Sequence, residues 1–406
     1  MKLCRSILWV LIMALSADIL FGESMPTTGE IVKANNSFAI DLYAHLAKQP
    51  GNLVLSPFSI DTTLAMTYAG ARGETARQMA KVLHLPNNDT NIHASFAALL
   101  DELNNTNIFG CQLDVVNSLW AQQGYSFSES FQNLLHDQYH SHLNQIDLTG
   151  WPHEFNLNKA SAARSQINEW VANQTGNKIK EILPKSLPSA NTRLILVNAT
   201  YFKGLWAKPF NKSLTRNATF HVSSEKSILI PTMHTEGSFN YSEDENVQAL
   251  EMPYFSNQLS MVILLPKTNY GLSKLEENLT MSEIEQLQQA SHLQKVNVSL
   301  PKFRQTSEFD LTRPLAAMGI KDAFNENDAD FSGITSMKPF FVEAVIHKIY
   351  VDVNEEGTEA AAATGVTFSD SLSASFNADH PFLFLIRHNP TGTILFIGRI
   401  NNPLNK

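Results

Sequence analysis

Serine, histidine and aspartate are plentiful in this chain of 406 residues, but their spacing matches no known hydrolase signature. The sequence has no G-x-S-x-G elbow, no H-E-x-x-H zinc motif, no P-loop and no G-x-G-x-x-G dinucleotide motif. The 13 histidines are scattered and are not paired at the spacing of metal ligands. A catalytic triad is recognised by geometry, so a missing motif does not exclude one. The pattern nevertheless predicts that the chain is not an enzyme and that it needs neither a cofactor nor a metal.

Thiol chemistry is also limited, because the chain has only two cysteines, Cys4 and Cys111. Cys4 lies in an N-terminal segment that we expect to be removed. The mature chain can then form no internal disulfide and no metal site built on thiolates. We expect Cys111 to be a buried, small apolar side chain.

The most informative segment runs from Asn354 to Phe376 and reads NEEGTEAAAATGVTFSDSLSASF. It is rich in Ala, Gly, Ser and Thr, and it lies between two apolar runs that we expect to be strands, Val342–Val353 and His380–Ile386. Loops of this length in a compact domain are usually functional or disordered. Three interpretations fit the composition: a surface helix, because Ala is the best helix former, a linker without a role, or an extended segment that can become a strand.

The third interpretation has a specific geometry, because alternate residues of an extended chain share a face. One face would carry only small side chains, those of Thr358, Ala360, Ala362 and Thr364. The opposite face would carry Glu359, Ala361 and Ala363. The first face could lie over an apolar core while the second meets water, and Gly357 supplies a hinge. Such a segment could slide between two existing strands, but composition alone does not choose between strand and helix.

The elements around this segment indicate an α+β domain. Apolar residues at helical spacing predict helices over 32–47, 59–68, 75–83 and 165–171. Apolar and β-branched runs predict strands over 193–202, 247–252, 259–265, 296–300, 342–353, 382–386 and 394–397. Helices thus dominate the first half and strands the second, which is typical of large, mostly antiparallel sheets. No repeat and no change of composition marks a domain boundary.

The N-terminus has the layout of an export signal. Lys2 and Arg5 flank the start, and Ile7–Leu15 is a run of nine apolar residues, too short to span a bilayer. A buried first helix is the alternative. Small residues at Ser16, Ala17 and Gly22 leave the cleavage point open between residues 16 and 22. We therefore expect a signal peptide within residues 1–22 and a secreted product, exported to the periplasm or beyond in a bacterial host.

The net charge of −9 argues against a broad nucleic-acid face and against binding to anionic membranes. Cleavage after Ala17 would remove Lys2 and Arg5 and make the charge −9 − 2 = −11. Several N-x-[ST] triplets occur; those at Asn88 and Asn104 lie in polar stretches and could carry glycans, whereas Asn198 lies in an apolar strand and should not.

Segments spread over nearly the whole mature chain resemble the serpin family of protease inhibitors, in family order. They are NLVLSPFSI (52–60), VNATYFKGLWAKPF (197–210), ALEMPYF with LSMVILLP (249–266), SLPKF (299–303), ADFSGIT (329–335), VIHKIYVDVNEEGTEAAAAT (345–364) and ADHPFLFLIRH (378–388). The resemblance implies a single α+β serpin domain over residues 30–406, with three β-sheets, eight or nine helices and an exposed reactive-centre loop at about 355–376.

The resemblance also implies suicide inhibition. In inhibitory serpins a serine protease, or sometimes a cysteine protease, cleaves the loop and forms an acyl-enzyme. The loop then inserts into the largest sheet as a new strand, which distorts the protease before water can release it. The intact fold is accordingly metastable, and a charged group on the inserting face would have to enter the core at a cost of several kcal/mol.

Family motifs assign three groups of residues. The hinge comprises Glu355, Glu356, Gly357, Thr358, Glu359, Ala360, Ala361, Ala362, Ala363 and Thr364. A sheet-opening network, the shutter, would comprise Asn52, Ser56, Ser59, Asn198 and His347. At the top of the sheet, the breach would comprise Trp206, Lys302 and Glu355, with an ion pair between the last two. Strand alternation independently places Asn198 and His347 toward the core, where each could also be an ordinary buried polar group.

The scissile bond has two candidate positions. Counting seventeen residues from Glu355 gives Ser371–Leu372, which suits an elastase-like or mixed specificity. Counting back from FNADHPF gives Phe368–Ser369, which suits a chymotrypsin-like pocket. We expect serine endopeptidases, and some cysteine proteases, as partners of a monomeric inhibitor.

Two further expectations complete the interpretation. Heparin activation is not expected, because the region from Thr75 to Leu103 contains only Arg77 and Lys81 as basic residues. The alternative from another class is a non-inhibitory serpin with a carrier, chaperone or storage role. Such members often have larger or charged hinge residues, which this chain lacks.

Overall fold

A computed structural model describes residues 28–86, 91–104, 110–150, 154–357 and 373–405. Within these residues the chain forms nine α-helices, two short 3-10 helices and fourteen strands. The α-helices are α2 (Thr28–Leu46), α3 (Pro57–Tyr68), α4 (Gly73–Val82), α5 (Ile92–Asn104), α6 (Glu129–Tyr139), α7 (Leu157–Gln174), α8 (Leu272–Glu277), α9 (Met281–Ala290) and α10 (Thr312–Met318). The 3-10 helices are η1 (Lys212–Leu214) and η2 (Asp322–Phe324).

The strands divide between two hydrogen-bonded sheets. The five-stranded sheet has the order β10 (Phe303–Asp310), β11 (Val342–Val353), β4 (Leu194–Gly204), β2 (Cys111–Gln122), β3 (Leu143–Ile146). The nine-stranded sheet has the order β1 (Leu53–Leu55), β14 (Ile394–Ile400), β13 (Phe382–His388), β8 (Leu259–Pro266), β7 (Val247–Pro253), β6 (Lys226–Glu243), β9 (His292–Pro301), β12 (Ala374–Asn377), with β5 (Arg216–Ser223) paired to β6.

The expected α+β domain is confirmed. The three expected sheets correspond to the five-stranded sheet and to two arms of the nine-stranded sheet. The arms join at β6, whose 18 residues pair in turn with β5, β9 and β7. Most pairs are antiparallel, as expected; the parallel pairs are β11·β4, β2·β3 and β12·β9.

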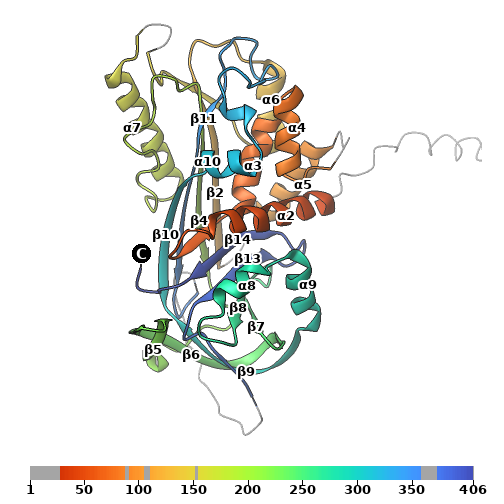
Figure 1. Cartoon of the computed structure of the whole chain (residues 1–406), viewed down its shortest axis with the longest axis vertical. Helices are drawn as coiled ribbons and strands as arrows, with labels where there is room; N and C mark the ends of the chain where they lie inside the picture. Colours follow the sequence, from red (N-terminus) through yellow and green to blue (C-terminus); the bar gives the residue numbers. More distant parts are fainter. Residues whose placement is uncertain (1–27, 87–90, 105–109, 151–153, 358–372, 406) are drawn as a thin grey trace, which may run out of the picture.

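Helices cover both faces of the five-stranded sheet (Figure 1). Helix α7 lies on one face, where Ile167 and Val171 pack with Trp120, Val197 and other buried residues of the sheet in a small separate core. Helices α2 to α6 lie on the other face, over the main core. Both faces of β4 are therefore covered, and nearly all of its residues are buried, whereas the second half of β11 alternates buried residues with the partly exposed Lys348, Tyr350 and Asp352.

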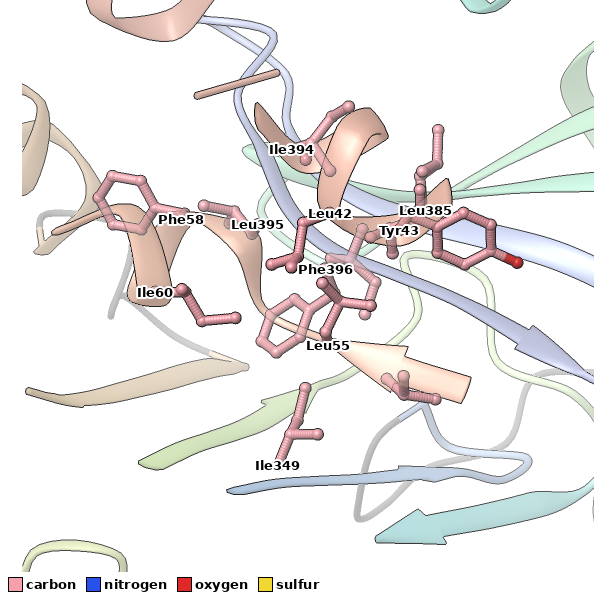
Figure 2. Close-up of a cluster of buried hydrophobic side chains, with 14 of the residues drawn as sticks. Leu42, Tyr43, Leu55, Phe58, Ile60, Ile349, Leu385, Ile394, Leu395 and Phe396 are labelled. Atoms are coloured by element: carbon pink, nitrogen blue, oxygen red, sulfur yellow. The ribbon is translucent and has the colours of Figure 1, made fainter. Parts of the chain in front are cut away.

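The main core joins the two sheets below α2 and α3. Figure 2 shows Leu42 of α2, Ile60 of α3 and Ile349 of β11 gathered around Leu55 and Phe396; all five are 0% exposed. Helix α3 is consequently buried on nearly every side, and all but the last of its twelve residues are buried. This central helix lies against the strands of the candidate site.

Several elements differ from the sequence prediction. Strand β2 was not expected, because both of its faces are covered toward its C-terminal end and it lacks an alternating pattern there. The expected loop ends earlier than Phe376, because Ala374–Asn377 already forms β12, in parallel pairing with β9. Its first residues, Glu355–Gly357, form a turn rather than part of a free loop. Residues 1–27, which include the expected signal peptide, lie outside the described residues.

Candidate functional site: the join between strands β11 and β4

Strands β11 and β4 run parallel, and their ladder extends from Val342 opposite Leu194 to Tyr350 opposite Tyr201. Beyond Tyr350 the two strands continue without pairing to each other, for three residues in β11 and for three in β4. This end of the join lies beside the turn that follows β11. The candidate site consists of a polar network within the ladder and a second cluster at its open end.

The polar network centres on His347 and Asn198, which are register partners across the ladder and are both fully buried. Nδ1 of His347 forms a hydrogen bond with Oδ1 of Asn198, and the backbone N–H of Ser56 donates to Nε2 of His347 at 3.2 Å. Because Nε2 accepts, the proton is on Nδ1, which donates to Asn198. Burial lowers the pKa of His347 to about 3, so the ring is neutral at physiological pH.

The amide nitrogen of Asn198 connects the ladder to helix α3. It lies 2.5 Å from the hydroxyl of Ser59 and 3.2 Å from that of Thr63, both on α3. It also lies 2.5 Å from Oδ1 of Asn117, its register partner on β2. The hydroxyl of Ser56 donates to the carbonyl of Leu395 in β14 at 2.8 Å. One buried network thus links two helix residues, Ser59 and Thr63, with four strands, β11, β4, β2 and β14.

The sequence prediction for this network was incomplete. It named Ser56, Ser59, Asn198 and His347, which the structure brings together. Asn52 lies elsewhere: its side chain bonds to Gln305 at 2.9 Å and to the backbone of Asn401 and Asn402 near the C-terminus. The prediction missed Asn117 and Thr63. Neither residue belongs to an N-x-[ST] triplet. The sequence signal that could have identified them is a polar residue within a mostly apolar stretch of β2 and of α3.

The open end of the join is closed by the turn Asn354–Gly357. The backbone N–H of Asn354 donates to the carbonyl of Gly357 at 2.9 Å, and the reverse bond measures 3.2 Å. Gly357 also bridges Leu205, directly after β4, in antiparallel orientation. Its φ is +129°, and a Cβ there would lie 2.1 Å from the carbonyl oxygen of Gly204, so only glycine fits.

Charged and aromatic side chains hold this turn. Nζ of Lys302 lies 2.8 Å from Oε2 of Glu355, so the expected ion pair is formed, and Thr215 donates to Oε1 at 2.8 Å. Burial alone would raise the pKa of Glu355, but the hydrogen bonds from Lys302 and Thr215 outweigh it and lower the pKa. Glu356 pairs with Lys212. Sequence analysis did not identify Thr215 or Lys212.

Trp206 holds the turn through two hydrogen bonds. Its indole N–H donates to the carbonyl of Asn354 at 3.0 Å, and its backbone N–H donates to that of Glu356 at 3.0 Å. The ring is 1% exposed and stacks on Tyr254, with centroids 4.6 Å apart and planes at 9°. The three residues expected at the top of the sheet, Trp206, Lys302 and Glu355, therefore surround one turn.

The remaining expected residues lie outside the described part of the chain. They are the hinge residues Thr358, Glu359, Ala360, Ala361, Ala362, Ala363 and Thr364, and the candidate cleavage residues Phe368, Ser369, Ser371 and Leu372. Asn88 lies outside it as well, as does the side chain of Asn104. Asn198 is buried and bonded, so it cannot carry a glycan, as expected. Cys111 is buried with a free thiol, also as expected.

Two features are absent from the described part of the chain. No three His, Cys, Asp or Glu side chains gather as metal ligands there. None of the helices described is both long and apolar enough to cross a membrane.

Comparison with known proteins gives a consistent result. The family model for serpins (serine protease inhibitors) matches residues 33–403. An uncharacterized serpin-like protein of Thermococcus kodakarensis is 43% identical over 92% of this chain and 86% of its own length. The leukocyte elastase inhibitor of Equus caballus is 39% identical over 92% of this chain and 100% of its own.

Solved structures agree. The crystal structure of a highly specific serpin of the insect Tenebrio molitor matches with a TM-score of 0.81 and 32% identity, over 92% of this chain and 98% of the other. Uncleaved ovalbumin matches with a TM-score of 0.84 and 30% identity, over 92% and 100%.

Proposed function

This chain belongs to the serpin family, and we propose that it is a suicide inhibitor of serine endopeptidases, with some cysteine proteases as further targets. The protease attacks a carbonyl carbon in the segment after Gly357, and the peptide bond breaks to give an acyl-enzyme and a new amino terminus. The freed segment enters the sheet between β11 and β4 and carries the attached protease with it. Each inhibitor molecule is used once.

The position of Gly357 carries this proposal. The residue already bridges Asn354, after β11, and Leu205, after β4, and it does so in antiparallel orientation on both sides. It therefore occupies the first row of a strand that would lie between β11 and β4. The next residue along the chain is Thr358, the first of the small residues.

The strand directions support the same path. A segment that turns back after β11 runs antiparallel to β11. Because β4 is parallel to β11, the same segment also runs antiparallel to β4. Insertion would replace one parallel ladder with two antiparallel ones, which are slightly more stable per residue. It would also have to separate His347 from Asn198.

The length and composition of the segment suit this role. Residues 358–368 number eleven and residues 358–371 number fourteen, compared with twelve in β11. The inserting face would carry the Ala and Thr side chains named above, which can lie against a packed core without clashes.

Strand β12 favours the cut at Phe368–Ser369. This position leaves five residues, 369–373, before β12 begins at Ala374, whereas the cut at Ser371–Leu372 leaves two, 372 and 373. Residues within β12 are already paired with β9 and cannot also pair with the extended binding cleft of a protease. Phe368 would direct the inhibitor to chymotrypsin-like enzymes; Ser371 would fit the elastase inhibition named in relatives.

Incubation with chymotrypsin and with elastase tests the function. We expect a complex that survives denaturation in SDS, and a released fragment whose N-terminal sequence begins at Ser369 or at Leu372. Cleavage without a complex would instead support the non-inhibitory class, and repeated turnover of a peptide substrate would support a hydrolase.

Export is part of the proposal and rests on the N-terminal sequence alone. It predicts that the protein secreted by an expressing cell begins between residues 17 and 23. A secreted or retained product that still begins at Met1 would contradict it.

A further inference from the structure

Asp61 is an anomaly of helix α3. It is 0% exposed, and neither carboxylate oxygen has a hydrogen-bond partner. Buried carboxylates are strongly unfavourable unless they are paired or bonded. Asp61 lies two residues from both Ser59 and Thr63, so its side chain is on the face of α3 opposite the two hydroxyls that contact Asn198.

The hydroxyls on the same helix cannot serve Asp61, because they are used within the helix. Thr62, Thr63 and Thr67 each donate to the carbonyl four residues earlier, at 2.8–3.0 Å. Asp61 therefore has no local donor, and its neighbours on α3 offer no compensation for a negative charge.

A titratable group of α6, Tyr139, interacts electrostatically with Asp61. Burial, and then the charge of Asp61, raises the pKa of Tyr139 well above its usual value. The hydroxyl of Tyr139 lies 2.7 Å from Nδ1 of His93 on α5. Burial lowers the pKa of His93 to about 4, so His93 is neutral at physiological pH and supplies no positive charge.

The other elements packed against α3 supply no cation either. On α2 the buried Tyr43 bonds to Glu276, and on β14 Arg399 pairs with the same Glu276. The charged residues of α4 are on its exposed side, where Glu74 pairs with Arg77. The side chains that β2 and β4 direct at α3, Asn117 and Asn198, are uncharged.

We propose that Asp61 tunes the opening of the sheet through helix α3, because its carboxyl is tolerated in the packing around this helix only while it holds a proton. Losing the proton places an unpaired charge in the packing of the same helix whose opposite face holds Asn198 through Ser59 and Thr63. Asp61 is thus a positioning residue that acts through α3, and its role in opening rests on the inhibitory function proposed above.

The direction of the pH effect follows from burial, which raises the pKa of Asp61 well above its usual value. The unfolded chain ionises Asp61 near pH 4, whereas the folded chain keeps the proton to a much higher pH. Relative to a variant that cannot ionise, the intact protein therefore loses stability as pH rises above about 4. The loss is at most tenfold in the folding equilibrium per pH unit.

The test compares wild type with Asp61→Asn by thermal unfolding of the intact protein between pH 5 and pH 9. We expect the variant to be the more stable protein, with an advantage that grows as pH rises. Spontaneous conversion of the intact protein to a form that no longer inhibits reports the rate at which the sheet opens and Asn198 is released. At pH 8 this rate should be at least tenfold lower in the variant.

Asp328→Asn, at an exposed carboxylate bonded to Asn325, is the matched control and should leave the pH profile unchanged. Asp61→Ser replaces Asp61→Asn if the latter does not fold. An advantage independent of pH, or a variant less stable than wild type at pH 8, overturns the proposal. The unfolding profile needs no protease, so a chain that fails to inhibit refutes the proposed function and not this inference.

Discussion

His347 and Asn198 face each other across the parallel ladder between β11 and β4, and a buried hydrogen bond joins their side chains. A new strand cannot enter this ladder without separating them. The same bond therefore stabilises the closed sheet and must be broken for the sheet to open. If the chain acts by the proposed mechanism, the network around this bond contributes to the barrier that keeps the intact protein from inserting its loop.

We predict that His347→Gln destabilises the intact protein and changes its pH profile. At pH 7.5 the loss of the ring leaves the backbone N–H of Ser56 without its acceptor, at a cost of about 1–3 kcal/mol. In wild type the unfolded His347 takes up a proton below about pH 6.5, whereas the folded ring resists until about pH 3. Wild type therefore loses up to about 1.4 kcal/mol per pH unit within this window.

Urea unfolding at pH 7.5, 6.0 and 5.0 measures this effect. The gap between wild type and His347→Gln should narrow as pH falls, whereas His292→Ala, at an exposed position at the start of β9, should track wild type. A gap that stays constant from pH 7.5 to 5.0 would mean that His347 does not titrate as its burial requires.

Lys302→Met should loosen the turn after β11. The carboxylate of Glu355 is 7% exposed and would lose the ammonium at 2.8 Å. Because Lys302 itself is partly in water, we expect a loss of about 1–2 kcal/mol and faster spontaneous loss of inhibitory activity at 37 °C. The stabilisation by Glu355 is present above its ordinary pKa and is lost as pH falls through its lowered folded-state pKa, so the variant and wild type should converge in acid.

Lys267→Met is the control for this prediction, because Lys267 pairs with Glu243 at 2.9 Å on the surface. It should change stability by less than about 1 kcal/mol. Equal effects of the two substitutions would show that the pair at the turn has no special role.

Thr358→Arg should convert the inhibitor into a substrate. The bond remains accessible, but the guanidinium would have to enter the core at the first step of insertion, so deacylation should be completed first. Gel electrophoresis in SDS should show cleaved protein and little complex. Glu359→Arg places the same charge on the opposite face and should still form complex. A stable complex from Thr358→Arg would refute the insertion model.

Some of these features could be predicted from the sequence, because they depend on local patterns. Strand alternation placed Asn198 and His347 toward the core, and both are fully buried. The bounds predicted for β11, Val342–Val353, are those observed. This run is long and rich in β-branched residues, so its extent depends little on neighbouring elements.

Other features depend on register and packing between distant segments, which one sequence does not reveal. Asn117 joins the network because β2 pairs with β4 in one register, and Asn52 leaves it because the C-terminal segment offers better partners. Asp61 could not have been identified as a buried carboxyl, since a twelve-residue helix is usually buried on one side only. Helix α3 is an exception because sheet and helices surround it.

Thermal unfolding before and after a single cut in the segment 358–372 tests the central claim most directly. If the intact chain is held short of its most stable fold, the cut form should insert its new end between β11 and β4. It should then unfold at least about 10 °C higher, a gain of several kcal/mol for a domain of this size. An unchanged or lower unfolding temperature after the cut would contradict the account.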